Sequence, residues 1–489
     1  MSDAPVRDQF IGGRWVPAAD GRTYPDTSPY DGRLVAQAAA SGRADAQAAI
    51  DAAAAAFPAW AATTPQARAA IFLRAADILA RRADEVRTML TAETGATQDF
   101  AAFQVARSID TLRVAAGWPY LAVGEVLRSG VPGRFAFTVR HPLGVVFGIT
   151  PWNGAHILAW RTILTPLAYG NTVVLKPSED APVVAGLMIA EVMEEAGLPA
   201  GVLNVITNAP GEIGPVADAV FESDAVRLIM FTGSAPTARR LAERAGRHLK
   251  RTVLELGGYN PLIVLADADV DRAVEAALFA SFYHQGQICM NARKIIVERP
   301  LMAQFTDAFV ARAETLVRGD PADPATFIGP LITDRAAELV EAQVAEAVAA
   351  GGRVLTGGTR DGRLFAPTIL ADVPATADAA REEIFGPVVL VEAADSGEDA
   401  VRIANATCYG LSAAILSGNA DRALSLAHGL EAGMIQVNEQ TVAGEIGFPN
   451  GGVKQSGWGY TGPAGLHDFT EIRQMSVQAA IGAYPVPKP

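Results

Sequence analysis

The segment Gly144-Val145-Val146-Phe147-Gly148-Ile149-Thr150-Pro151-Trp152-Asn153-Gly154 begins the part of the chain that decides the fold. Its first six residues form a short apolar run with β-branched side chains, which is typical of a buried strand. Similar runs follow at Thr172–Leu175, Val202–Ile206 and Val226–Phe231, with a helical stretch, Ala181–Ala196, after the first. Strands that alternate with helices predict βαβ units, and therefore a parallel sheet that is covered on both faces.

A second series of the same kind follows this one. Strand-like and helical runs occur in it at Asn260–Leu265, Val270–Tyr283, Arg293–Val297, Pro300–Arg318, Arg335–Ala350, Gly386–Val391 and Gly410–Leu416. The Ala-rich stretches Ala44–Phe57 and Gln66–Thr94 have apolar residues three and four apart, which predicts two or more amphipathic helices. We therefore expect two α/β lobes with a boundary near Gly257-Gly258.

Two segments lie outside both series. Arg128–Arg140 alternates apolar and polar residues, which predicts a hairpin that projects from the body. The strand-like residues Met475–Ala480 are expected to pair with it.

Composition excludes several classes of protein. The chain has 489 residues, of which 50% are apolar, and its net charge is −13. The apolar fraction favours a large folded core, and the negative net charge argues against a nucleic-acid or anionic-membrane partner. No apolar run approaches the roughly 18 residues of a spanning helix, and the first residues lack the features of a secretory signal. With two cysteines there is no disulfide framework, so we expect a soluble cytoplasmic protein.

Common catalytic signatures are missing from the sequence. The six histidines show no ligand spacing, so no metal site is expected. No G-x-S-x-G motif is present, which argues against an α/β-hydrolase. The G-x-G-x-x-G pattern at Gly457–Gly462 lies near the C-terminus without the βαβ context of a dinucleotide fingerprint, so we do not interpret it as one.

Two residues stand out as candidates for covalent and acid–base chemistry. Cys289 follows a polar, glycine-containing loop, where backbone N–H groups can stabilise a thiolate, whereas Cys408 suits a small buried hydrophobe. Glu255 is a lone carboxylate in an apolar strand, where burial makes it a stronger base. The alternative for Glu255 is an ion pair with an arginine such as Arg251.

Two strand ends carry further polar candidates. Asn153 follows the first strand, and its amide can donate to a developing oxyanion, although an Asn-Gly turn is the commoner role. Lys176 and Glu179 flank the exit of the second strand, where they can bind the hydroxyls of a ribose or simply face water.

Taken together, these motifs resemble the aldehyde dehydrogenase superfamily over nearly the whole chain. The resemblance is carried by Pro151-Trp152-Asn153, Lys176-Pro177-Ser178-Glu179, Phe231-Thr232-Gly233-Ser234, Leu254-Glu255-Leu256-Gly257-Gly258, Gly286-Gln287-Ile288-Cys289, Glu382-Glu383-Ile384-Phe385-Gly386-Pro387 and Gly451–Gly457. Each motif alone is a weak signal, but all of them occur here in the family's order.

The resemblance implies a mechanism. Cys289 attacks the aldehyde, Asn153 and the Cys289 backbone N–H hold the oxyanion, hydride passes to the nicotinamide, and Glu255 activates the water that hydrolyses the thioester. The residues it places near the cofactor are Thr150, Trp152, Lys176, Glu179, Gly233, Ser234, Glu383 and Phe385. A carboxylate at Glu179 accepts from a ribose 2′-OH and repels a 2′-phosphate, so we expect NAD rather than NADP.

The resemblance also implies an architecture. It predicts a Rossmann-like cofactor-binding domain at residues 1–124 and 144–256 and a catalytic domain at 257–455. Both are doubly wound parallel sheets. Residues 125–143 and 470–489 would form a small β extension through which family members assemble as homodimers or homotetramers.

Substrate class rests on fewer residues. Arg161 and the segment Val437–Val442 resemble the benzaldehyde, salicylaldehyde and vanillin dehydrogenase branch, and Arg161 would hold a ring hydroxyl or carboxylate. The alternative is that Arg161 is a structural arginine in a helix. Asn450 stands where the family usually has Phe, on a loop that faces the substrate, which predicts a more polar pocket.

Other functions remain open at this point. They are oxidation of aliphatic aldehydes or semialdehydes, transfer of the acyl group to CoA, a cofactor-independent thiol esterase, and an inactive relative. The carboxylate at Glu255 favours water over CoA, and an esterase would leave Lys176, Glu179, Glu383 and Phe385 without a purpose.

Overall fold

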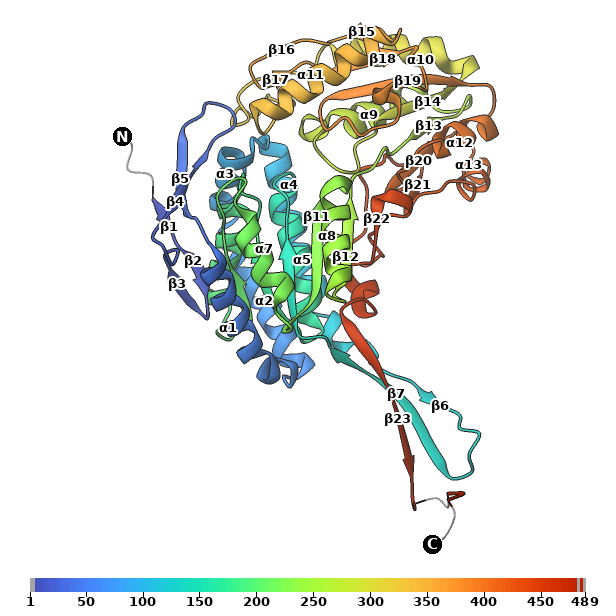
Figure 1. The fold of residues 1–489 in the computed structure, drawn as a ribbon. Coiled ribbons are helices and arrows are strands. Elements are labelled where there is room, and N and C mark those ends of the chain that lie inside the picture. The colour runs from blue at the N-terminus through green and yellow to red at the C-terminus, as the bar shows by residue number, and fades with distance from the viewer. Residues whose placement is uncertain (1–4, 482–483, 487–489) are drawn as a thin grey trace.

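The protein was analysed as a computed structural model that describes residues 5–481 and 484–486. Residues 1–4, 482–483 and 487–489 lie outside the described residues. The last three of them are the end of the predicted C-terminal extension. Two α/β lobes stand side by side, and a thin β arm extends from the body (Figure 1). This arrangement confirms the predicted fold class.

The first lobe is built on an eight-stranded sheet. Its strands, in spatial order, are β22 (Gly457–Trp458), β12 (Arg251–Leu256), β11 (Val226–Gly233), β8 (Val145–Ile149), β9 (Thr172–Lys176), β10 (Leu203–Val205), β2 (Gln9–Ile11) and β3 (Arg14–Val16). The strands from β12 to β10 are parallel, and the others are antiparallel additions at the edges. The sheet therefore also includes residues far downstream, at 457–458.

Helices cover both faces of this sheet. They are α1 (Arg43–Ala61), α2 (Pro65–Arg81), α3 (Ala83–Thr94), α4 (Gln98–Ala115), α5 (Ala155–Ala168), α6 (Met188–Glu195), α7 (Ile213–Glu222) and α8 (Ala235–Arg247). Successive residues of β8 point to opposite faces, so Val145 and Phe147 pack with α1 and α7 while Val146 packs with α5 and α6. Both faces are apolar, as a doubly covered parallel sheet requires.

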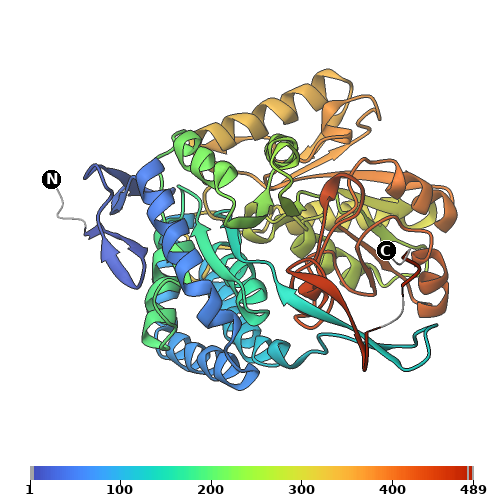
Figure 2. The same ribbon diagram turned by 60° about the horizontal axis from the view of Figure 1, so that its bottom comes forward.

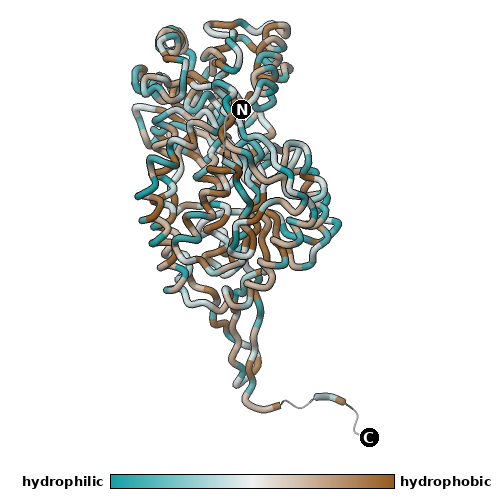
Figure 3. The backbone as a smooth tube through the Cα atoms, turned by 90° about the vertical axis from the view of Figure 1, so that its left-hand side faces the viewer, coloured by the Kyte–Doolittle hydropathy of each residue, from teal (hydrophilic) through white to brown (hydrophobic). Residues whose placement is uncertain are grey.

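The second lobe contains a seven-stranded sheet. Its order is β15 (Arg353–Thr356), β18 (Thr368–Ala371), β19 (Val388–Ala394), β14 (Lys294–Glu298), β13 (Leu262–Val264), β20 (Ser412–Leu416) and β21 (Met434–Val437). All but β15 are parallel. Its helices are α9 (Val270–Phe282), α10 (Arg299–Ala313), α11 (Asp334–Ala349), α12 (Gly397–Asn405) and α13 (Ala420–Ala427). The apolar interior of both sheets is visible as the brown segments inside the body in Figure 3.

The arm pairs segments that are more than 300 residues apart in sequence. Strand β7 (Arg134–Pro142) pairs with β6 (Val126–Leu127) on one side and over nine residues with β23 (Thr470–Gln478) on the other. Figure 2 shows β7 and β23 running together past the edge of the body. The predicted pairing therefore exists, but its C-terminal strand begins at Thr470 rather than Met475.

Several small elements were not predicted. Strands β1 (Val6–Arg7), β4 (Thr23–Thr27) and β5 (Leu34–Ala39) form a sheet near the N-terminus, and β16 (Arg360–Asp361) pairs with β17 (Leu364–Phe365). Runs of two to six residues are too short for a periodicity to be recognised. Across the described part of the chain, no helix combines the length and the apolar character needed to cross a membrane.

A close contact between β8 and α5 positions the helix that follows Asn153. A Cβ added to Gly148 would lie 2.4 Å from Cγ2 of Thr162 on α5. We therefore expect Gly148→Ala to lower the free energy of unfolding by about 1–3 kcal/mol, because overpacking forces the helix away from the sheet. Urea unfolding at matched protein concentration measures this change.

The matched control is Gly246→Ala. Gly246 lies in α8, and a Cβ there meets nothing within 4 Å. Alanine favours a helix by up to about 1 kcal/mol over glycine, so this variant should be equal to or more stable than the parent. Equal losses of stability in both variants would contradict the packing argument.

Candidate active site

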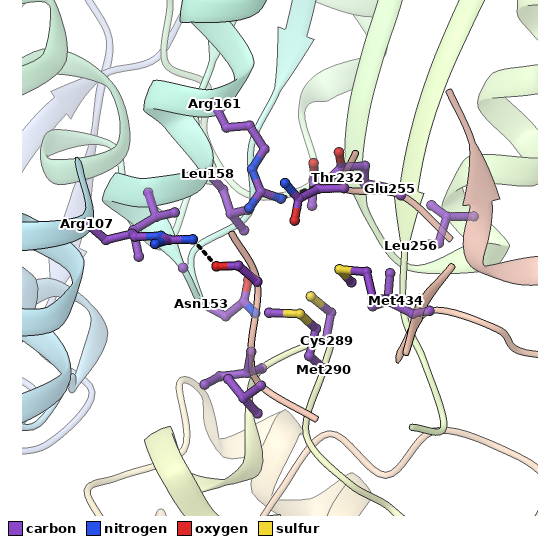
Figure 4. A pocket seen from close by; sticks show the side chains of 18 of the residues that line it. Arg107, Asn153, Leu158, Arg161, Thr232, Glu255, Leu256, Cys289, Met290 and Met434 are labelled. Carbon is purple, nitrogen blue, oxygen red and sulfur yellow. Dashed lines mark hydrogen bonds and ion pairs between the residues drawn. The ribbon is translucent and has the colours of Figure 1, made fainter. Parts of the chain in front are cut away.

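The predicted catalytic residues meet where the two lobes face each other. Asn153 lies just beyond β8, Glu255 is the penultimate residue of β12, and Cys289 follows a tight turn at Tyr283–Gly286. Together with Thr232 and Leu256, these three residues line two cavities at once. The structure therefore brings together three side chains that are far apart in sequence (Figure 4).

The loop that carries Cys289 has an unusual backbone. His284, Gln285 and Gly286 have φ values of 52°, 55° and 67°, so three successive residues are left-handed. A Cβ at Gly286 would lie 2.1 Å from the carbonyl oxygen of Gly386, so only glycine fits there. Such a turn persists only where its surroundings hold it.

Buried amides hold this loop in place. Asn260, itself at a φ of 47°, donates from Nδ2 to the carbonyl oxygens of Cys289 (2.7 Å) and Asn291 (2.8 Å). The side chain of Asn291 accepts from the backbone N–H of Ile288 at 2.6 Å. The position of Cys289 is thus set by hydrogen bonds to backbone atoms on both sides of it.

Asn153 is fixed against the same loop. Its Nδ2 donates to the carbonyl oxygen of Gln287 at 2.8 Å, which leaves the second amide hydrogen free. Within the described residues, the backbone N–H of Cys289 has no acceptor. Two donors are therefore available beside the thiol, which is the arrangement an oxyanion needs.

The thiol of Cys289 is protonated at rest. Burial raises its pKa to about 12, and the carboxylates of Glu383 and Glu255 act in the same direction. Arg161 and Arg293 oppose this shift. Burial outweighs the two cations, because the free energy lost when a thiolate is removed from water exceeds the free energy gained from its attraction to the two arginines.

Glu255 is held by two side chains. Arg161 donates from Nη1 to Oε2 at 3.1 Å, and the hydroxyl of Thr461 donates to Oε1 at 3.2 Å. The alternative of an arginine partner is therefore real, but the partner is not Arg251, which donates to the carbonyl of Thr470. Thr461 belongs to the G-x-G-x-x-G segment, whose edge strand β22 pairs with Glu255.

One of the two cavities opens between α4 and α5. With the solvent at its mouth its volume is about 870 Å³. The apolar and aromatic side chains among its lining residues are Phe100, Phe103, Ile157, Leu158, Leu256, Ile288, Met290, Leu411, Met434 and Val442, and its cations are Arg107 and Arg161. Asn450 also lines it, but its amide donates to Phe448 and Glu445 of its own loop.

Sequence analysis missed the α4 wall of this cavity. Phe100, Phe103 and Arg107 are three and four residues apart, so they share one face of α4. Gly154, Ile157, Leu158 and Arg161 form the matching stripe on α5. The spacing was visible in the sequence, but nothing in it indicated that these two stripes face each other.

The second cavity lies on the other side of Cys289. It is lined by five of the predicted cofactor residues: Trp152, Gly233, Ser234, Glu383 and Phe385. The rings of Trp152 and Phe385 meet edge to face at 5.8 Å. Glu383 packs against Gly257, and burial raises its pKa to about 7.

The remaining predicted cofactor residues do not line this cavity. Lys176 ends β9, and its Nζ donates to Glu179 at 2.8 Å. Despite burial, Lys176 keeps the pKa of Glu179 below its usual value, so the carboxylate is charged. The hydroxyl of Thr150 is buried without a partner in the part of the chain that the structure describes.

The site and fold define a cysteine-dependent dehydrogenase, and the comparisons agree. The sequence pattern of the aldehyde dehydrogenase family matches residues 15–475, and the chain belongs to this family. It is therefore an NAD(P)-dependent aldehyde oxidoreductase. A vanillin dehydrogenase from Pseudomonas fluorescens is 44% identical over 99% of this chain and 100% of the relative.

Solved structures give the same result. A salicylaldehyde dehydrogenase from Pseudomonas putida G7, complexed with salicylaldehyde, is 35% identical with a TM-score of 0.96 over 99% of this chain and 100% of that one. A betaine aldehyde dehydrogenase from Staphylococcus aureus, in complex with NAD+, is 30% identical with a TM-score of 0.94 over 98% and 95%. The family resemblance predicted from the motifs is confirmed.

The state of the thiol can be tested without substrate or cofactor. In a Cys408→Ala variant, alkylation of Cys289 by iodoacetamide should accelerate about tenfold per pH unit from pH 7 to 10, because the thiolate fraction grows throughout this range. Mass spectrometry of timed samples gives the rates. A plateau below pH 9 would show that Cys289 ionises as easily as an exposed thiol.

Proposed function

We propose that the protein oxidises an aromatic aldehyde to its carboxylic acid with NAD. One observation supports this most strongly: Cys289, Asn153 and Glu255 form the wall shared by two cavities, so an aldehyde on one side and a nicotinamide on the other would meet at the thiol. The aromatic and apolar lining of the α4–α5 cavity suits a ring. The vanillin and salicylaldehyde dehydrogenases among its relatives support the same substrate class.

In the first step the sulfur of Cys289 bonds to the carbonyl carbon of the aldehyde, the C=O π bond opens onto the oxygen, and the thiol proton passes to solvent. The free hydrogen of the Asn153 amide and the backbone N–H of Cys289 donate to the oxygen as it becomes negative. Because both donors are tied to the same loop as the sulfur, they need not reorganise during the reaction. Bound NAD would supply the hydride acceptor, so that loss of hydride from the carbon leaves a thioester of Cys289.

Glu255 then removes a proton from the water that attacks the thioester. The C–S bond breaks, the carboxylic acid leaves, and the proton held by Glu255 returns to the sulfur of Cys289. Arg161 and Thr461 hold one oxygen each of this carboxylate, so its orientation is set before water arrives. This contact also revises the predicted role of Arg161. Its guanidinium positions the base, and the ring would be contacted by Phe100, Phe103 and the apolar residues around them.

The second cavity fits a dinucleotide. Ser234 precedes α8, whose first turn lines the cavity and has no side-chain cap. A free helix N-terminus donates its N–H groups to phosphate oxygens. Trp152 and Phe385 offer aromatic surface to a nicotinamide ring, and the charged Glu179 would accept from the adenosine ribose.

We also propose that the arm joins copies of the chain into a homodimer or homotetramer. Apolar side chains on it are exposed in the single chain: Val126, Leu127, Phe135, Ile472, Met475 and Val477. Val126, Phe135, Met475 and Val477 share one face of the arm, and Leu127 and Ile472 lie on the other. Exposed apolar side chains gathered in this way mark an interaction surface. A monomer in sedimentation velocity at micromolar concentration would contradict this assembly.

A cytoplasmic location completes the proposal. Cys289 and Cys408 are both free thiols in the structure. A reducing compartment keeps such thiols available for chemistry.

The function is tested by following reduced nicotinamide across an aldehyde panel. Benzaldehyde and its hydroxylated relatives should give higher kcat/KM than short aliphatic aldehydes or semialdehydes, because the cavity lining buries a ring. Cys289→Ala should abolish turnover, and Cys408→Ala should leave it nearly unchanged because Cys408 lines neither cavity. A preference for aliphatic substrates would overturn the aromatic class but not the family.

Cofactor choice is tested at Glu179. Glu179→Gln removes the charge that would repel a 2′-phosphate and weakens acceptance from a 2′-OH. We expect kcat/KM for NADP relative to NAD to rise about tenfold or more in this variant. The KM for benzaldehyde should not change, since Glu179 lies outside the α4–α5 cavity. An unchanged cofactor ratio would contradict the assignment.

A further inference from the structure

Two arginines face the α4–α5 cavity, but they differ in their partners. Arg161, on α5, forms an ion pair with Glu255, the only carboxylate among the residues that line this cavity. Arg107, on α4, forms no ion pair with any described residue. Its guanidinium donates to the backbone carbonyl of Gly444, as the dashed line in Figure 4 shows. Among the described residues, Arg161 therefore has a carboxylate partner at the cavity and Arg107 has none.

Arg107 stands at the end of an aromatic stripe. Phe100 and Phe103 precede it on the same face of α4, and all three line the cavity that contains Cys289. A ring whose aldehyde group reaches Cys289 would pass along this stripe. Its other end would then lie near Arg107.

A small polar recess adjoins the cavity at this point. It shares Arg107, Ile157, Arg161 and Asn450 with the main cavity and adds the hydroxyl-bearing Thr111 and Thr461. Most of the main cavity is apolar, and the hydroxyls of Thr111 and Thr461 already donate to the carbonyl of Arg107 and to Glu255, so the donors left in this region are the two guanidinium groups. Such a recess suits oxygen atoms on a substrate better than it suits hydrocarbon.

The charges around Arg107 also favour an anion. Burial lowers its pKa, and the nearby charge of Arg161 acts in the same direction, while Glu445 and Asp110 oppose the shift. An arginine nevertheless stays protonated in proteins. A negative group beside Arg107 would relieve the repulsion between the two guanidinium groups.

We propose that Arg107 is a specificity-determining residue that binds an anionic oxygen substituent, a carboxylate or a phenolate, at the end of the substrate remote from the aldehyde. This inference rests on the proposed function, because it concerns the same cavity. It assigns to Arg107 the recognition that the sequence predicted for Arg161. Part of the hydrogen-bonding capacity of Arg161 is used by Glu255, whereas Arg107 has no carboxylate partner among the described residues.

The test compares 4-carboxybenzaldehyde with benzaldehyde, which differ only in the charged group. The parent enzyme should prefer the carboxylated substrate. Arg107→Met should lower kcat/KM for it by about tenfold to a hundredfold, mainly through KM, because a hydrogen bond to a charged group is lost. Benzaldehyde should change less than threefold, and Arg107→Lys should restore part of the preference.

Arg113→Met is the matched control. Arg113 lies on the same helix but is exposed and pairs weakly with Asp110, at 3.8 Å. This variant should behave as the parent with both substrates. If Arg107→Met lowers kcat/KM for both substrates equally, Arg107 has only a structural role and the inference is overturned.

The same variants separate this inference from the proposed function. If the parent does not oxidise ring aldehydes, the aromatic class is wrong, and succinic semialdehyde against butanal then tests Arg107. Loss of preference for the semialdehyde in Arg107→Met would support anion binding on an aliphatic substrate. No preference for either anionic substrate in the parent would overturn the inference.

Discussion

A buried stretch of irregular backbone carries Cys289, and the rest of the site depends on how that backbone is satisfied. Its N–H and C=O groups cannot pair with one another as in a helix or strand, and water does not reach most of them. Side chains supply the missing partners. Asn260 donates to the carbonyls of Cys289 and Asn291, and Arg293 donates to the carbonyl of Ile288 at 3.2 Å. Asn153 joins the same set, so the oxyanion donor and the nucleophile share one support.

The side chains that hold this loop also affect the charge state of Cys289. Arg293 is completely buried, and burial lowers its pKa to about 10. Its charge favours ionisation of Cys289, whereas burial and Glu383 oppose it. The balance leaves a thiol that stays neutral until a substrate arrives. A site held by buried polar side chains therefore obtains its geometry and its resting charge state from the same residues.

Much of the fold and part of the site could be predicted from sequence. The long apolar runs identified both parallel sheets, since burial of a strand on both faces leaves a strong local signal. Cys289, Glu255 and Asn153 were recognised because each is a polar residue at the end of an apolar element. Thr461 was not, because its contact with Glu255 spans 206 residues and has no local pattern.

Arg161 and Arg107 show most clearly what cannot be predicted from sequence alone. The sequence offered a helical position for Arg161 as one alternative, and the spacing of Phe100, Phe103 and Arg107 is present in it, although no helix was predicted there. Only the tertiary structure decided that α4 and α5 enclose one cavity, that Glu255 takes Arg161 as its partner, and that Arg107 has no carboxylate partner among the described residues. The periodicity of apolar residues shows which face of a helix or strand is buried, because this pattern lies within the element's own sequence. The choice of a charge partner depends on distances between elements, which are set only when the whole chain has packed.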